Sequence, residues 1–459
     1  MPFIRFCLIA VIFLLSSIVV FAQDKAPKVD DLDALLSSDK PVKQEEKNPL
    51  YNAFKQAKWT WNAVGYNFTK HNEQQDQSRG DDTKFRQFYT QLLMDTWIEV
   101  MKYEIKVDLL LQYGSEKDQY GPSRIAYFSQ LYVKKKLETS DLIFGYKYIE
   151  DGISTLYSPA KRIAKADADH PTDPDKLGVW QASWTYYYTG NNSTEIRLMP
   201  YFQKSRYPPE PARWSAGKGD YDIVDSDLTG QLDTDYQITE KKIRHHLTDS
   251  GFMAKQKMTV EGVDFFVSAY EGYLPNPVLK RVSANHYEKQ YIKGGILAAG
   301  FSTVQGKWEW HGEGVCQVPE NRKEDAYINY VFGSEYDLNT FMKIDAIDSA
   351  KLIIEYSNEW VLEDQNHPDY PANQRSSRFG RNAIYILQKV DINDKNKVSY
   401  GAVYNISKKD NTHRLTYERK FKEGKSIETF YEWFNGGEKT HFGRWKENDR
   451  IVVKFTKKF

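Results

Sequence analysis

The sharpest cluster of chemically active side chains in this sequence is a histidine between two glutamates. Glu309, His311 and Glu313 occur at every second position, so in a β-strand all three side chains point the same way. Carboxylates beside an imidazole attract cations or exchange protons with a bound molecule. Three interpretations stay open: an ordinary polar wall, a patch that selects ions, or an acid–base group.

No established catalytic motif accompanies this cluster. The sequence contains no Gly-x-Ser-x-Gly elbow, no His-Glu-x-x-His zinc motif and no glycine-rich phosphate loop. We therefore expect no enzyme activity, no metal site and no cofactor.

A long polar insertion, residues 203–251, carries two weaker candidates. Asp225–Asp233 resembles the start of a calcium loop, but Tyr236 stands where the bidentate Glu is expected. A hydrated acidic loop is the favoured interpretation. Residues 239–247 are expected to form either a short helix that narrows a pore or a solvated loop face, and they carry Lys241, Lys242, Arg244, His245 and His246.

Alternation of apolar and polar residues dominates from about residue 58 onward and predicts amphipathic strands. Residues 180–189 place Trp and Tyr side chains at even positions, and the return strand places Ile196 and Leu198 opposite Glu195 and Arg197. The later alternations are Trp308 and Trp310 against Lys307, Glu309, His311 and Glu313, and Leu415 and Tyr417 against Arg414 and Glu418.

Strands near the C-terminus are expected at 382–390, 397–407, 413–422, 427–434 and 450–459. Alternation alone also fits a soluble β-sandwich. Aromatic residues toward the strand ends, and short connections such as 391–396 beside long ones such as 71–84 and 363–377, instead favour a membrane barrel. We expect an all-β fold: a transmembrane antiparallel up-and-down β-barrel of about 16 strands, roughly 14–18, with short periplasmic turns and long outer loops.

Composition excludes other classes. Lys+Arg and Asp+Glu each total 63, which gives no support to a nucleic-acid partner. A mean hydropathy of −0.68 excludes a bundle of membrane helices. The chain is 15% aromatic and 27% charged, so rings and charges are expected on separate surfaces.

The chain ends predict export. Residues 1–22 contain Arg5, an apolar run and a small-residue context at Ala22, which is typical of a signal peptide; a retained anchor is the alternative. Its removal would leave Cys316 without a disulfide partner in the chain. Residues 23–55 are expected to form a polar periplasmic tether, with a plug or a partner-docking helix as the alternative, and residues 56–459 the barrel.

The last strand places Ile451, Val453, Phe455 and Phe459 on one face, interrupted by Lys457. It resembles the final strand of Gram-negative outer-membrane barrels. The resemblance implies that Phe455 and Phe459 form a signal read by the barrel-assembly machinery.

Several segments resemble an incompletely characterised family of porin-like outer-membrane proteins, some of which are associated with lipid-export systems. These segments are 130–133, 141–145, 184–209, 263–273 and 294–317. The resemblance implies a place in the cell outer membrane, contact with its lipid and lipopolysaccharide, and a loop at 151–154 folded into the lumen. The chain departs from the family pattern at Tyr146-Lys147-Tyr148, where a basic residue and Gln often follow the glycine.

We therefore expect a channel or export conduit that passes small polar solutes or an amphiphile. Its expected pore-lining residues are Glu195, Arg197, Lys307, Glu309, His311, Glu313, Arg414 and Glu418. The alternatives are a closed structural or binding barrel plugged by a loop, and a secreted soluble β-rich protein that binds carbohydrate through its aromatic residues.

Overall fold

The computed structural model of the chain describes residues 55–70, 86–100, 102–118, 121–168, 171–188, 191–206, 214, 237–243, 246–283, 286–340, 347–370, 378, 380–437 and 440–459. The expected signal peptide and all but the last residue of the expected tether lie outside these residues. Contacts divide the chain into two units, Met1–Gln56 and Ala57–Phe459. All the strands of the barrel lie in the second unit.

Within the described residues, 18 antiparallel strands form one closed barrel. Closure is complete because β1 pairs with both β2 and β23. The strands are β1 (Lys58–Phe68), β2 (Arg86–Val100), β3 (Tyr103–Asp118), β4 (Gly121–Lys136), β5 (Ser140–Lys147), β8 (Val179–Tyr187), β9 (Ser193–Met199), β11 (Gly251–Val260), β12 (Val263–Tyr273), β15 (Lys293–Gln305), β16 (Trp308–Pro319), β17 (Ala326–Asp337), β18 (Ser349–Glu363), β19 (Ala383–Asn393), β20 (Asn396–Asn405), β21 (Asp410–Lys420), β22 (Lys425–Asn435) and β23 (Arg450–Lys458).

The barrel has 18 strands, where the sequence predicts about 16, so the central prediction is wrong. The number lies at the top of the predicted range of roughly 14–18. Very short turns account for the difference. The hairpins β11–β12 and β15–β16 are each closed by only two residues, 261–262 and 306–307. Glu261 and Gly262 have φ values of 50° and 80°, the left-handed geometry that a two-residue hairpin requires. Tight turns leave more of the chain for strands.

Most short connections lie at one end of the barrel and most long ones at the other. Hairpin turns such as 261–262, 394–395 and 421–424 lie at the end where β1 begins and β23 finishes. The opposite end carries longer connections, including 148–178 and 364–382. This arrangement agrees with the expected contrast between tight turns and long loops.

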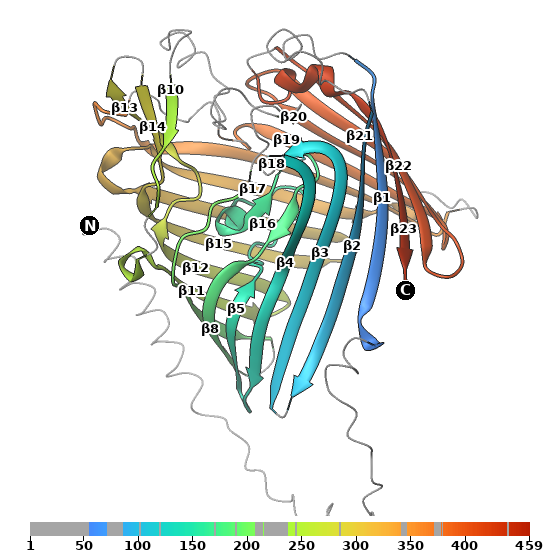
Figure 1. Cartoon of the computed structure of the whole chain (residues 1–459), viewed down its shortest axis with the longest axis horizontal. Helices are drawn as coiled ribbons and strands as arrows, with labels where there is room; N and C mark the ends of the chain where they lie inside the picture. The colour runs from blue at the N-terminus through green and yellow to red at the C-terminus, as the bar shows by residue number, and fades with distance from the viewer. Residues whose placement is uncertain are drawn as a thin grey trace, which may run out of the picture. The chain divides into compact units, whose positions relative to one another are not determined.

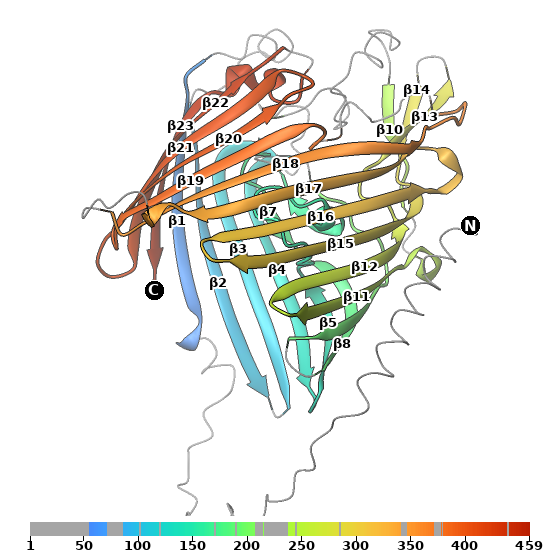
Figure 2. The same ribbon diagram turned by 180° about the vertical axis from the view of Figure 1, so that it is seen from behind.

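The two faces of the wall differ as the alternation predicts. Trp184, Trp308 and Tyr404 are about two-fifths exposed, whereas His311 and Glu313 are buried. The ring-bearing face therefore points outward and the ionised face inward. The near and far walls cross steeply in Figures 1 and 2, because barrel strands tilt in opposite senses on opposite sides.

Smaller elements occupy the connections. They are η1 (Pro159–Ile163), β6 (Lys165–Asp167), β7 (Asp175–Leu177), β10 (Gln237–Glu240), η3 (Leu247–Asp249), β13 (Val278–Ser283), β14 (His286–Gln290), η4 (Glu320–Arg322), η5 (Leu338–Thr340) and η6 (Gly443–Asn448). The helix expected at 239–247 is wrong at its start, because Thr239 and Glu240 pair with β14 in a sheet. The candidate calcium loop at 225–233 lies outside the described residues. None of the helices in the described parts is long and apolar enough to span a membrane.

Candidate functional site: the barrel interior and its strap

Residues 148–168 and 171–178, the described parts of the connection from β5 to β8, fold into the barrel; these residues are the strap. It lies between the near and far walls in both views (Figures 1 and 2). Ile149, Ala160 and Ile163 are buried in one apolar cluster with inward residues of the wall such as Phe266 and Val315. The expectation that residues 151–154 fold into the lumen agrees with this placement.

Glu313 of β16 is the first anchor of the strap. Its Oε2 accepts hydrogen bonds from the backbone N–H groups of Ile153 and Ser154, at 2.7 and 3.1 Å. Its Oε1 accepts from the Ser158 hydroxyl at 2.5 Å and from the Ala160 N–H at 3.0 Å. A buried carboxylate is tolerated when donors surround it, and here the strap backbone supplies most of those donors.

Gly152 makes this anchor sterically feasible. Its φ is +90°, and an added Cβ would lie 2.0 Å from Ser158 Oγ and 3.0 Å from Glu313 Oε2. A side chain is excluded both by the backbone conformation and by the space that the anchor occupies.

Glu355 of β18 is the second anchor. It accepts the N–H groups of Thr155, Leu156 and Tyr157 at 2.8, 2.9 and 2.8 Å. His311 Nε2 lies 2.9 Å from Glu355 Oε1. His311, which the sequence places beside Glu309 and Glu313 on β16, therefore contacts the Glu355 carboxylate of β18, two strands away.

A glycine on the intervening strand permits this contact. An added Cβ at Gly333 would lie 2.6 Å from His311 Nε2 and 2.5 Å from Glu355 Cγ. The His311 and Glu355 side chains therefore meet over Gly333, which has no side chain to separate them.

Asp151 ties the start of the strap to the wall of β9 and β11. Lys255 Nζ forms a short ion pair with Asp151 Oδ1, and Arg197 Nη1 lies 3.6 Å from Asp151 Oδ2. Arg197 also donates to Glu195 Oε1 at 2.7 Å. All but Glu195 of these side chains are almost completely buried.

The later part of the strap reaches the opposite wall. The Thr172 hydroxyl donates to Glu432 Oε2 of β22 at 3.0 Å, and the Thr172 carbonyl accepts from Arg414 Nη2 at 2.9 Å. Glu432 also pairs with Arg414 and Arg450, at 2.8 and 2.9 Å. The strap thus crosses the interior and is fixed at both sides.

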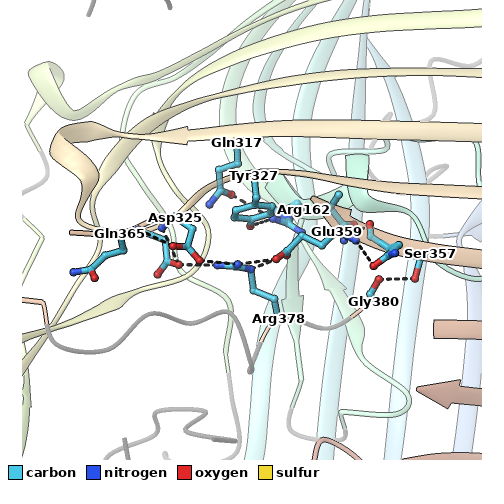
Figure 3. Close-up of polar contacts among 12 residues, drawn as sticks. Arg162, Gln317, Asp325, Tyr327, Ser357, Glu359, Gln365, Arg378 and Gly380 are labelled. Atoms are coloured by element: carbon cyan, nitrogen blue, oxygen red, sulfur yellow. Dashed lines mark hydrogen bonds and ion pairs between the residues drawn. The ribbon is translucent and has the colours of Figure 1, made fainter. Parts of the chain in front are cut away.

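An aromatic ring links the strap to the β18–β19 connection (Figure 3). Arg162 of the strap and Arg378 of that connection lie 5.1 and 4.3 Å from the ring centre of Tyr327. Arg162 also donates to the Tyr327 hydroxyl. Cations over an aromatic face are favourable, so the two segments share a contact on β17.

Arg378 is the centre of a buried ionic group. It donates to Glu324 at 2.8 Å, to Asp325 at 2.9 Å and to Glu359 at 2.7 Å. The planar guanidinium joins two carboxylates of the β16–β17 connection and one of β18. This group ties the β18–β19 connection at Arg378 to the β16–β17 connection and to β18.

A chamber remains between the strap and the wall of β19–β22. Its volume is about 730 Å³. Leu156, Pro171 and Thr172 of the strap line one side. Wall residues including Val403 and Arg414, together with Trp214 and residues of the β22–β23 connection, line the rest.

Burial perturbs ionisable groups in the connections around this interior. It lowers the pKa of Lys165, on the strap, to about 7. The ammonium lies 4.5 Å from the ring centre of Phe202. Burial also lowers the pKa of His441 to about 4 and of Arg444 to about 9. Each shift reflects the cost of holding a charge away from water.

The residues expected to line a pore lie at several separate places on the barrel. Arg197 lies beside Asp151 and pairs with Glu195. His311 contacts Glu355, and Glu313 itself accepts hydrogen bonds from the strap. Glu309 accepts from Ser302 Oγ at 3.2 Å, and Arg414 borders the chamber. Glu418 is half-buried on the inward face of β21, whereas Lys307 is exposed in the 306–307 turn.

Sequence reasoning missed Glu355, Glu432, Asp151 and Lys255. A signal for the first two does exist. Glu355 comes two positions after Ile353, and Glu432 has Phe430 and Phe434 two positions away on either side, all on the inward faces of their strands. A carboxylate between apolar inward-facing residues is unfavourable unless a hydrogen-bond donor or a cation contacts it. Its position therefore indicates a buried contact. The sequence does not reveal that the partners of Glu355 are backbone N–H groups about 200 residues earlier, or that Glu432 meets the Thr172 hydroxyl of the strap.

The C-terminal residues close the barrel. The Phe455 ring packs against Trp61 with centroids 5.6 Å apart. The Phe459 N–H donates to the Trp59 carbonyl at 2.9 Å, and its ring is exposed. Their role as an assembly signal stays a prediction.

No protein-family profile and no curated protein sequence matches the chain. Solved structures of similar fold include outer-membrane porins of Gram-negative bacteria. OccK11 (OpdR) of Pseudomonas aeruginosa has 9% identity and a TM-score of 0.47, covering 88% of this chain and 95% of its own. OccAB4 of Acinetobacter baumannii has 10% identity and a TM-score of 0.45, covering 88% and 98%. A mutant Rh. blastica porin has 8% identity and a TM-score of 0.41, covering 88% and 99%.

Proposed function

We propose that this protein is an outer-membrane channel for small solutes, with a lumen narrowed by the strap. The observation that carries the proposal is the fixing of the strap to both walls of a closed barrel whose outer face is apolar. A closed barrel satisfies every backbone group in hydrocarbon. A wall of this size encloses more space than wall side chains fill, and the strap occupies part of that space.

Passage would be governed by size and by charge, with no chemical step. Glu313 and Glu355 are already satisfied by strap amides and contribute little to a filter. Wall charges outside the anchors, such as Glu309 and Glu418, are better placed to act on a solute. The mixed signs of the inward charges favour weak selectivity between cations and anions.

Planar-bilayer recording tests the proposal. The purified full chain should show a small, steady conductance, and Glu355→Ala should raise the conductance or its noise by releasing the strap. Glu309→Ala is the matched control for strap release, because it removes an inward carboxylate that does not hold the strap; it should change ion selectivity and leave the noise unchanged. A folded barrel with no conductance in any variant would exclude an open channel.

A closed binding barrel is the second candidate. It is favoured by the apolar packing of Ile149, Ala160 and Ile163, which makes the strap part of the interior core. Conductance that appears only after the strap is released would establish this version. A conduit for an exported amphiphile is a third version, and it predicts that lipid co-purifies with gently extracted protein.

The cellular setting is part of the same proposal. We place the protein in the outer membrane, in contact with lipid and lipopolysaccharide, inserted by the barrel-assembly machinery and serving an export system in the conduit version. Recovery from the soluble fraction without detergent would contradict this setting and support a secreted carbohydrate-binding protein instead.

A further inference from the structure

One side of the wall has a hollow on its outward face. Strands β3, β4, β5 and β8 lie side by side there (Figure 1), and β9 pairs with β8. The hollow has a volume of about 440 Å³, within the roughly 300–1,000 Å³ typical of sites for small molecules. Its larger apolar lining residues are all exposed and include Val133, Leu142, Phe144, Trp184, Ile196 and Leu198. The hollow therefore opens on the outside of the barrel and not into the lumen.

The strand register explains why the wall is hollow at this place. One outward row of paired residues runs across β4, β5, β8 and β9 and consists of Val133, Phe144, Ala182 and Leu198. Ala182 is the one small residue of this row, and its partners Phe144 and Leu198 stand on either side of it. The space that a larger side chain would fill is left open between them.

The next outward row lies closer to the short turns and forms the polar edge of the hollow. It consists of Tyr103, Lys135, Leu142, Trp184 and Ile196, paired in register across the same five strands. The Lys135 ammonium lies 5.6 Å from the ring centre of Tyr103. Trp and Tyr prefer the level of the lipid headgroups, and a long lysine side chain reaches that level from apolar surroundings. This row therefore marks a membrane interface.

Lys135 differs from the lysines on either side of it. Lys134 and Lys136 lie on the other face of β4 and pair with Asp141 and Glu104, at 2.7 and 2.6 Å. Lys135 lies on the outward face and lines the hollow, and within the described part of the chain it forms no ion pair. An outward cation beside an apolar hollow is complementary to the phosphate of a lipid whose chain fills that hollow.

The wall is also at its shortest beside the hollow. Strands β5, β8 and β9 contain 8, 9 and 7 residues, whereas β3 and β4 contain 16 each. A membrane-spanning strand needs about 9–11 residues, and a bilayer adapts to a shorter span by becoming thinner. Acyl chains beside these strands therefore have to bend or shorten, and the hollow offers one chain a place to lie against the protein.

We propose that the hollow binds one phospholipid, with an acyl chain against Ala182 and the anionic phosphate against Lys135. The inference rests on the proposed membrane setting, in which the short turns face the periplasm and the adjacent leaflet contains phospholipid. It goes beyond that setting because it assigns a fixed lipid site to the outer face of the wall. Binding there requires neither an open lumen nor release of the strap.

Native mass spectrometry of the delipidated full chain, titrated with palmitoyl-oleoyl phosphatidylglycerol, tests the apolar part of the site. We expect one saturable adduct at lipid concentrations that give no further adducts. Ala182→Leu fills the hollow and should lower the affinity for this lipid by roughly tenfold or more. Ala299→Leu is the matched control, because Ala299 is an exposed alanine of β15 that does not line the hollow. The adduct should be kept in this control.

The charged part of the site is tested with the same lipid. Lys135→Gln should lower its affinity roughly fivefold, and should not change the affinity for palmitoyl-oleoyl glycerol, which has the same chains and no phosphate. Lys457→Gln is the matched control, because Lys457 is an outward lysine near the same end of the barrel, 5.3 Å from the ring centre of Phe459, and does not line the hollow. Glycerol 3-phosphate, which has no acyl chain, should not compete.

Unchanged affinity in Ala182→Leu or in Lys135→Gln would overturn the proposal, as would an equal loss in the two controls. A protein dimer that disappears in Ala182→Leu would overturn it too, since a second copy of the chain would then cover the hollow. Heat-modifiable gel mobility verifies that each variant is a folded barrel, and Lys135→Gln decides the matter where Ala182→Leu fails to fold.

Bilayer conductance measured on the same preparations separates this inference from the proposed channel. A chain that conducts without a lipid adduct contradicts only the lipid site. A chain that keeps the adduct without conducting contradicts only the channel.

Discussion

Thr172 of the strap donates its hydroxyl to Glu432 of β22 over 3.0 Å, although the two residues are 260 positions apart. This bond and the Glu313 and Glu355 anchors on the other wall fix the strap across the barrel. The interior is therefore organised by carboxylates that hold a connection in place, and each anchor can be tested separately.

Removal of one anchor should loosen one part of the strap. In Glu355→Ala, the amides of Thr155, Leu156 and Tyr157 lose their acceptor, and hydrogen bonds to a charged group are worth about 1.5–3 kcal/mol each. Hydrogen exchange should accelerate first at these amides. In Glu313→Ala it should accelerate first at Ile153 and Ser154. Identical exchange patterns in the two variants would show that the anchors do not act separately.

Gly152→Ala should detach the strap near Asp151. The new Cβ would clash with Ser158 Oγ at 2.0 Å, in addition to the strain of a φ of +90°. Gly262→Ala is the control, because it carries a φ of +80° with nothing within 4 Å and should cost only about 1–3 kcal/mol of backbone strain. Proteolysis within the strap, measured in folded protein, should increase in the first variant alone.

Arg378→Met should be strongly destabilising. It leaves Glu324, Asp325 and Glu359 without their shared cation, and breaking a buried ion pair from one side costs about 3–5 kcal/mol. Arg322→Met removes an exposed pair with Glu363 and should cost at most about 1 kcal/mol. Urea unfolding monitored by heat-modifiable gel mobility measures both, and similar midpoints would contradict the assigned role.

The strap should dock more firmly as the pH rises above neutrality. Burial lowers the pKa of Lys165 from 10.5 to about 7 in the docked state. Below about pH 7 the cost of burying the charge is fully present, and between about pH 7 and 10.5 the docked form is progressively favoured because it is already neutral. Conductance noise should fall over that window in the natural chain and stay flat in Lys165→Met. A persistent slope in the variant would assign the effect to another group.

Charged substitutions on the outward face should destabilise the barrel more at the middle of the bilayer than near its surfaces. Phe144 is 64% exposed near the middle of β5, and Phe144→Arg should cost roughly 2–4 kcal/mol if the position meets the middle of the bilayer. Leu362 is exposed near the end of β18, and Leu362→Arg should cost about 0–1 kcal/mol. Folding yield into lipid vesicles gives the comparison. Equal tolerance at both sites would argue against a membrane-facing wall.

The sequence by itself determined the wall. Apolar and polar residues alternate with period two, as in the strand that carries Glu309, His311 and Glu313, and this pattern assigns each side chain to one face. The five strands expected after residue 381 match β19–β23 to within a few residues. Local pattern sufficed because strand direction and side-chain face are local properties.

Only the tertiary structure decided what fills the barrel. Glu313 has the same strand position as a pore-lining residue would have, yet it binds amides of Ile153 and Ser154 from a connection about 160 residues earlier. Backbone donors are common to nearly all residues, so no sequence pattern marks which of them a carboxylate will meet. The chamber beside Arg414, the pairing of His311 with Glu355 and the total of 18 strands likewise depend on how distant segments meet once the wall has closed.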